Sequence, residues 1–117
     1  MNKTIKKREN ALICALTEAC EMAKDWNIGF QWLTHTARHN AFPHSLLIFC
    51  VFSSDAEMDR ATERSDDEML RLAIQKQLAK IGVRVKDIRQ HVRIDSEESC
   101  LREDQGNWQK RLARLSV

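Results

Sequence analysis

The stretch Ser45-Leu46-Leu47-Ile48-Phe49-Cys50-Val51-Phe52-Ser53-Ser54 decides the fold. Its seven consecutive apolar residues, 46–52, closely follow the single proline of the chain and end at two serines. An apolar run of this length that does not alternate with polar residues is typical of a strand covered on both faces. We therefore predict that 45–54 holds the central strand of a sheet. The run is far shorter than the roughly 20 residues that a membrane-spanning helix needs.

The residues upstream of this strand divide into two segments. Residues 4–24 contain no glycine or proline and carry apolar side chains at helical spacing, which predicts an amphipathic helix. The segment 30–40 has two interpretations, because Phe30 and Leu33 fit one face of a helix whereas Phe30 and Trp32 fit one face of a short strand. Its length and its lack of β-branched aliphatic residues favour a short helix that ends before the proline.

Two helix starts and a second strand follow the central strand. Ser54 and Ser65 each stand three residues before a glutamate, the spacing of a capping box, in which both side chains bond free amide groups of the first turn. The second of these helices is expected to run to Gly82, the residue type that ends many helices. A strand is predicted at 90–95, where valine and isoleucine alternate with polar residues, so that one face is wet and the strand lies near an edge.

The order of these elements predicts an α/β fold in a single small domain over residues 1–117, with a strand–helix–strand crossover and a small, parallel sheet of two or three strands. Two strands are few for a stable sheet, so a third is expected from 30–40, from 83–85 or from a second subunit. Ser96 is expected to cap a short helix. A stripe of apolar residues predicts a last helix at the carboxyl end: Trp108, Leu112 and Leu115.

The charges alternate in blocks although their sum is only +2. Residues 55–68 hold seven acidic and two basic residues. Residues 76–93 hold one acidic and six basic residues, and residues 95–104 hold five acidic residues and one basic residue. The basic stretch is a candidate for contact with a nucleic-acid backbone. The alternative is a solvated surface on which opposite blocks neutralise one another. The six candidate nucleic-acid-binding residues are Lys76, Lys80, Arg84, Lys86, Arg89 and Arg93.

His35 and His39 are the candidate metal ligands. On a helix these two residues would share a face, and two imidazoles at this spacing can bind zinc or another first-row ion. The pair lacks a third ligand and the glutamate of the H-E-x-x-H motif, since Thr36 and Ala37 follow His35. The alternative is two solvated histidines on the outer face of a helix.

The cysteines and glycines do not support catalysis. None of the four cysteines forms a C-x-x-C pair, and Cys50 lies inside the apolar run, where burial makes a thiol inert. Cys100, beside a capped helix, is the better candidate for a reactive thiol. The chain has three glycines and no P-loop, G-x-G-x-x-G or G-x-S-x-G motif. We therefore expect a protein that is not an enzyme and needs no cofactor.

Three short stretches carry a resemblance to a known family: Gly29-Phe30-Gln31-Trp32-Leu33-Thr34-His35, Phe42-Pro43-His44-Ser45-Leu46 and Cys50-Val51-Phe52. With the amino terminus and the late Asn107-Trp108, they resemble a small uncharacterised family of gamma-proteobacterial proteins that are often labelled Fis-family transcriptional regulators. The Fis fold is a helical dimer that ends in a helix-turn-helix, and the predicted strand at 45–54 does not match it. The resemblance therefore transfers no site residues.

These observations lead to three hypotheses of function. The first is a cytoplasmic, non-enzymatic binding or regulatory module that acts through a protein partner or self-association. The second is a nucleic-acid-associated, DNA-binding regulator that uses the basic stretch 76–93. The third is a metal-dependent enzyme at His35 and His39. No membrane partner is expected, and the cytoplasm is expected because the amino terminus has neither a long apolar segment nor a small-residue cleavage site.

Overall fold

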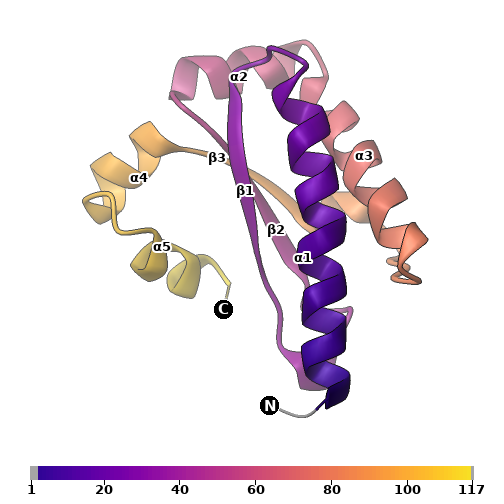
Figure 1. Cartoon of the computed structure of the whole chain (residues 1–117). Helices are drawn as coiled ribbons and strands as arrows, with labels where there is room; N and C mark the ends of the chain where they lie inside the picture. Colours follow the sequence, from indigo (N-terminus) through magenta and orange to yellow (C-terminus); the bar gives the residue numbers. More distant parts are fainter. Residues whose placement is uncertain (1–2, 117) are drawn as a thin grey trace.

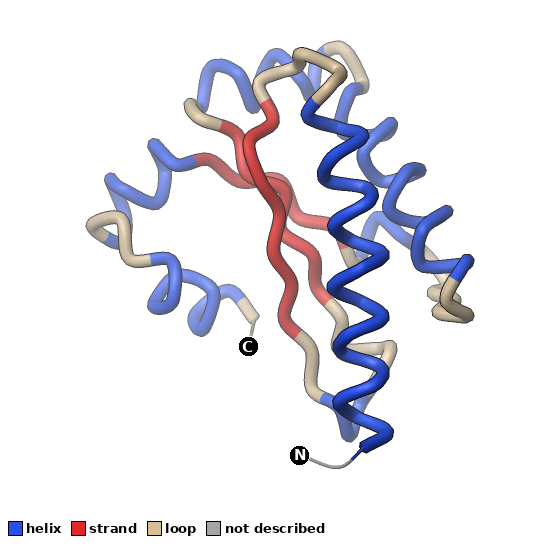
Figure 2. Tube along the Cα trace, viewed as in Figure 1, coloured by secondary structure: helices blue, strands red, loops and turns tan. Residues whose placement is uncertain are grey.

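The central strand of the sheet is β2 (Leu47–Phe52), as the apolar run predicts. The computed structural model describes residues 3–116. β2 pairs with β1 antiparallel and with β3 parallel, so the sheet is mixed and has the order β1-β2-β3 (Figures 1 and 2). Around β2, the other elements follow along the chain as α1 (Lys3–Lys24), β1 (Phe30–Thr36), α2 (Asp55–Glu63), α3 (Asp66–Lys80), β3 (Val92–Ser96), α4 (Glu97–Asp104) and α5 (Trp108–Leu115).

The prediction of a helix at 30–40 is wrong, because β1 occupies most of this segment. Thr34 and Thr36 are β-branched and suit a strand, a signal that the prediction overlooked. The deciding reason is not local: without β1, one edge of the buried strand β2 would present unpaired N–H and C=O groups. β1 supplies partners along the whole of β2, and its register is interrupted between Phe30 and Trp32. Residues 83–85, the other candidate for a third strand, form no strand.

Helices α1 and α3 cover one face of the sheet (Figure 1), which we call the first face. The helices supply aliphatic side chains to a core that continues into Ile48, Cys50 and Phe52 of β2. Leu12 and Ile74 in this core are completely buried. Successive residues of a strand point to opposite faces, so Phe49 and Val51 lie on the second face, and they are buried too.

The carboxyl-terminal helices α4 and α5 close the second face. Trp32 of β1 meets Trp108 of α5 edge to face, with ring centres 4.9 Å apart. Glu97 accepts a hydrogen bond from each indole, at 2.6 Å from Trp32 and 3.1 Å from Trp108. Arg111 of α5 donates two hydrogen bonds to Asp95 of β3, at 2.7 and 2.9 Å. Hydrogen bonds and an aromatic contact therefore tie the carboxyl-terminal helices to the sheet.

Two expectations about β3 and the helix caps are wrong. Asp95 and His91, which the alternating pattern places on a wet face, are buried: Asp95 pairs with Arg111, and His91 Nδ1 lies 2.7 Å from the carbonyl oxygen of Leu46. β3 does lie at an edge of the sheet. Ser65 has a left-handed backbone (φ 65°) and makes no capping bond with its side chain.

The other two predicted serine caps form. The Ser54 hydroxyl accepts a hydrogen bond from the Glu57 amide at 3.2 Å, and the Ser96 hydroxyl accepts one from the Ser99 amide at 2.9 Å. Among the helices of residues 3–116, none is both long and apolar enough to cross a membrane.

Gly29 makes the turn from α1 into β1 possible. Its φ of +90° lies in a region that side chains disfavour, and a Cβ atom built there would collide with the carboxylate of Glu57. The turn therefore lets the first turn of α2 lie directly against the start of β1.

Candidate nucleic-acid interface

All six predicted nucleic-acid-binding residues are exposed, but they do not lie on one element or one face. Lys76 and Lys80 belong to α3, which covers the first face of the sheet. Arg93 stands opposite Phe49 in the register and therefore lies on the second face. Arg89 is engaged with Asp87 through hydrogen bonds of 3.1 and 3.2 Å. Arg84 and Lys86 lie in the loop between α3 and β3.

A hollow of about 370 Å³, which we call the sheet-end hollow, lies where β1 ends and β2 begins. Three basic side chains line it from three segments: Arg38 just after β1, His44 in the loop before β2, and Arg93 on β3. The remaining lining residues are Thr36, Ala37, Ser45, Leu47 and Ser116. The lining therefore combines cations and hydroxyl groups and includes no carboxylate.

A second hollow of about 310 Å³, the loop hollow, shares His44 with the first. Its other exposed basic residues are Arg84 and Lys86, and it too has no carboxylate in its lining. His91 also lines it but is buried, with Nδ1 2.7 Å from the carbonyl oxygen of Leu46. The shared residue makes the two hollows neighbours. We call their five exposed basic residues together the cationic surface: Arg38, His44, Arg84, Lys86 and Arg93.

The basic stretch identified three members of the cationic surface and missed the other two. Arg38 and His44 precede the central strand, some 50 residues before Arg93 in the sequence, as the numbering shows. Only the pairing of β2 with both β1 and β3 brings them together. Two isolated basic residues near a proline carry no local signal that could have singled them out.

The guanidinium groups of the cationic surface have no hydrogen bond or ion pair to any side chain or backbone group of residues 3–116. Six other arginines are held by side-chain hydrogen bonds or ion pairs: Arg8, Arg71, Arg89, Arg102, Arg111 and Arg114. Within residues 3–116, the five without such a side-chain contact are Arg38, Arg60, Arg64, Arg84 and Arg93. Three of these five line the two hollows. Their charge is therefore available to a ligand.

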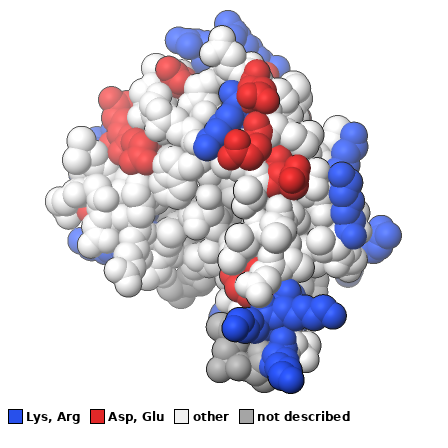
Figure 3. All heavy atoms as spheres, in the orientation of Figure 1, with Lys and Arg blue, Asp and Glu red and all other residues white. Residues whose placement is uncertain are grey.

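The acidic blocks do not neutralise this surface, because many of their carboxylates are engaged elsewhere. The hydroxyls of Ser96 and Ser99, followed by Arg102, hold the pKa of Asp55 at about 2. Arg114 lowers the pKa of Asp104, which also pairs with Arg111 at 2.8 Å. On the face drawn in Figure 3, acidic side chains lie mainly in the upper half, and basic ones lie at the upper edge, at the right-hand edge and at the lower end over the start of α1.

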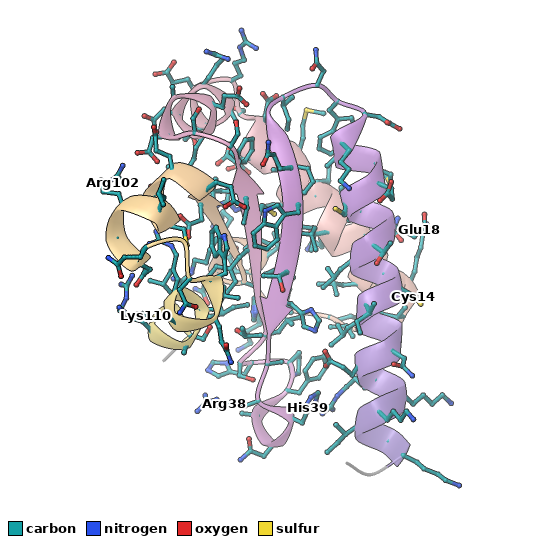
Figure 4. The ribbon with its side chains drawn as sticks, turned by 60° about the vertical axis from the view of Figure 1, so that its left-hand side comes forward. Cys14, Glu18, Arg38, His39, Arg102 and Lys110 are labelled. Atoms are coloured by element: carbon teal, nitrogen blue, oxygen red, sulfur yellow. The ribbon has the colours of Figure 1, made fainter. Side chains whose placement is uncertain are left out.

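His35 and His39 are brought together by α1 rather than by helical spacing, so the geometry behind the metal-site prediction is wrong. His35 Nε2 lies 2.6 Å from Oε1 of Glu9, and His39 Nε2 lies 3.5 Å from Oε2 of the same carboxylate. Arg8 donates to Nδ1 of His39 at 3.0 Å. Within residues 3–116, no group of three or more His, Cys, Asp or Glu side chains is placed to hold a metal ion. In Figure 4, His39 points toward α1 whereas Arg38 points away from it.

The structure agrees with the prediction for Cys50 and contradicts the prediction for Cys100. Burial raises the pKa of Cys50 to about 12, as expected for a thiol inside the apolar run. Cys100, the expected reactive thiol, is completely buried, and burial raises its pKa as well. Cys14 is the exposed cysteine among the described residues.

Comparison of the chain with models of known families, with curated proteins and with solved structures found no match in any of the three.

Proposed function

We propose that this protein binds the phosphate backbone of nucleic acid through the cationic surface. The observation that carries the proposal is the pair of adjoining hollows, which are lined by five exposed basic side chains and by no carboxylate. Two other hollows contain carboxylates: the groove beside α1 includes Glu21, and the one beside Gly29 includes Glu57 and Asp66. A small hollow of about 90 Å³ after α3 has no carboxylate, and its one basic residue is Arg84. The two adjoining hollows thus combine several basic side chains with no competing carboxylate, whereas the two arginines beside Gly29 share their hollow with acidic residues.

The residue types support a phosphate ligand. A guanidinium offers a planar fork of N–H donors that matches two phosphate oxygens, and charge-assisted hydrogen bonds of this kind are the strong ones. The large exposed apolar side chains among residues 3–116 include no aromatic one, so a platform for stacking bases is lacking there. We therefore expect contacts to the backbone and little preference for sequence.

Binding of a labelled oligonucleotide, single-stranded or duplex, tests the proposal. Raising the salt from about 50 mM to about 200 mM should weaken binding steeply, because each neutralised phosphate releases counterions. The double variant Arg84→Ala/Lys86→Ala should weaken binding to all sequences, and the salt slope should fall by about 1 for each phosphate that the variant no longer neutralises.

The matched control is Arg60→Ala/Arg64→Ala, which removes two exposed, unpaired arginines from α2 and the turn after it. The control should bind as the unchanged protein does. Absence of binding at low salt, or equal weakening by both double variants, would show the proposal to be wrong.

A second candidate function is self-association, and the free outer edge of β1 favours it. β1 pairs only with β2 in the described sheet, so its other edge presents unpaired backbone groups. A groove of about 470 Å³ follows this edge, between Leu33 on β1 and the half-exposed Ile13 on α1. In a two-fold dimer, the same strand of a second copy would pair with this edge.

A further inference from the structure

We infer that the sheet-end hollow holds a terminal phosphate, a phosphomonoester at the end of a nucleic-acid strand. This inference rests on the proposed function and names the ligand group that one part of the cationic surface selects. The hollow presents two guanidinium groups and one imidazole from three different segments. The hydroxyls of Thr36 and Ser116 also line it; because one of them donates to the other, one O–H group of this pair remains to donate to a ligand.

The walls of the hollow are held in place by hydrogen bonds that leave its cations free. The Ser45 hydroxyl donates to the carbonyl of Arg38 at 2.9 Å and accepts from the amide of Arg38 at 2.8 Å, which clamps the loop between β1 and β2. The Thr36 and Ser116 hydroxyls lie 2.9 Å apart and tie the end of β1 to the residue after α5. A ligand therefore meets a preformed site and orders little of the chain on binding.

The charge of the hollow matches a monoester better than an internal phosphate. A phosphomonoester carries about −1.5 to −2 charges at pH 7 and has three acceptor oxygens, whereas an internal backbone phosphate carries about −1. Arg38 and Arg93 together supply two permanent positive charges around one hollow. Two guanidinium groups that face a common space repel each other unless an anion lies between them.

The size and position of the sheet-end hollow also suit the end of a nucleic-acid strand. Its volume of about 370 Å³ is near the lower limit for small-molecule sites, which is adequate for one terminal nucleotide. The neighbouring loop hollow, reached through His44, supplies Arg84 and Lys86 for the phosphates that follow. The terminal phosphate would thus lie between Arg38 and Arg93, and the rest of the nucleic-acid strand would extend toward the loop hollow.

The test compares oligonucleotides of one sequence that carry a 5′-phosphate, a 3′-phosphate or only hydroxyl ends. We expect one phosphorylated form to bind about tenfold more tightly than the hydroxyl form, because it adds charge-assisted hydrogen bonds. The 5′ and 3′ arms identify the end that is recognised. Arg38→Ala/Arg93→Ala should remove this preference while Arg84 and Lys86 retain binding. Arg38→Lys/Arg93→Lys should keep part of the preference, since a lysine keeps the charge and loses the fork of donors.

Two further measurements separate this inference from the proposed function. Arg84→Ala/Lys86→Ala should weaken both forms equally and retain the preference. Equal affinity for phosphate and hydroxyl ends would overturn the inference and leave the proposed function standing. If no oligonucleotide binds, but a nucleoside monophosphate shifts the NMR signals of Thr36 and Ser45, then the hollow takes a monoester and the proposed function is wrong.

Discussion

At the scale of single residues, Asp55 links the start of α2 to the start of α4. Its Oδ1 accepts from the Ser96 hydroxyl at 2.6 Å and also from the Ser99 hydroxyl, while Oδ2 accepts from Arg102 at 2.9 Å. These bonds favour the ionised carboxylate, which is why the pKa of Asp55 falls from 3.8 to about 2. The acidic residue therefore joins two helices that follow neighbouring strands.

The lowered pKa of Asp55 predicts a dependence of stability on pH. The folded pKa lies below the unfolded one, so the contribution of Asp55 to the free energy of unfolding is complete above about pH 4 and is lost as the pH falls through about 2. Asp55→Asn should lower the free energy of unfolding at pH 7, and the difference from the unchanged protein should shrink in acid. Urea unfolding at several pH values measures this.

The control for Asp55 is Asp59→Asn on the exposed side of the same helix, where the side chain makes no hydrogen bond or ion pair within residues 3–116. This variant should change stability little at any of these pH values. A difference between Asp55→Asn and the unchanged protein that stays constant into acid would contradict the assignment of the pKa.

At the scale of elements, the buried arginine of α5 decides how the second face is closed. Arg111 lies between Asp95 of β3 and Asp104 of α4, with side-chain exposures of 6%, 9% and 2% for the three residues. Charges this deeply buried are tolerated because every one of them has a partner. The partners of Arg111 come from two other elements, β3 and α4, so the pairs hold α5 in one position on the sheet.

Removing this arginine should be costly. Arg111→Met keeps much of the volume but leaves two buried carboxylates without their shared cation, and we expect a loss of about 3 kcal/mol in the free energy of unfolding. Urea unfolding followed by tryptophan fluorescence measures the loss, because Trp108 lies on the same helix. Arg89→Met, which removes an exposed pair with Asp87, is the control and should cost much less. Equal losses in the two variants would refute this role of Arg111.

At the scale of the whole molecule, the alternating charge blocks separate in space. Asp95 and Asp104 turn inward to Arg111, and Glu98 accepts a hydrogen bond from the first residue of α2. The arginines of the cationic surface lie toward the opposite end of β2. A near-neutral chain thus has a local positive field, which can steer an anionic partner without a large net charge.

The second candidate function makes a prediction at the same scale. If β1 edges pair, the protein should sediment as a dimer, and Ile13→Glu should convert it to a monomer by placing a charge in the groove beside β1. Leu101→Glu alters an even more exposed apolar residue on α4 and should leave the dimer intact. A monomer at all concentrations measured by analytical ultracentrifugation would exclude self-association.

The local pattern of the sequence was enough for the elements whose signals lie within a few residues. The unbroken apolar run predicts β2, the helical spacing predicts α1 and α5, and Ser54 and Ser96 predict caps that form. In each case the physical cause is the period of the side chains or a bond between residues three apart. The α/β class and the parallel pairing of β2 with β3 follow from these elements and their order.

Tertiary structure decided the rest, because the interactions concerned join distant parts of the chain. The segment 30–36 is a strand since β2 requires a partner at its edge, and Asp95 is buried since Arg111 reaches it from α5. Arg38 and His44 meet Arg93 only after both edges of β2 are paired. A strand makes its hydrogen bonds to another segment rather than within itself, so its sequence alone does not reveal which side chains will lie beside it.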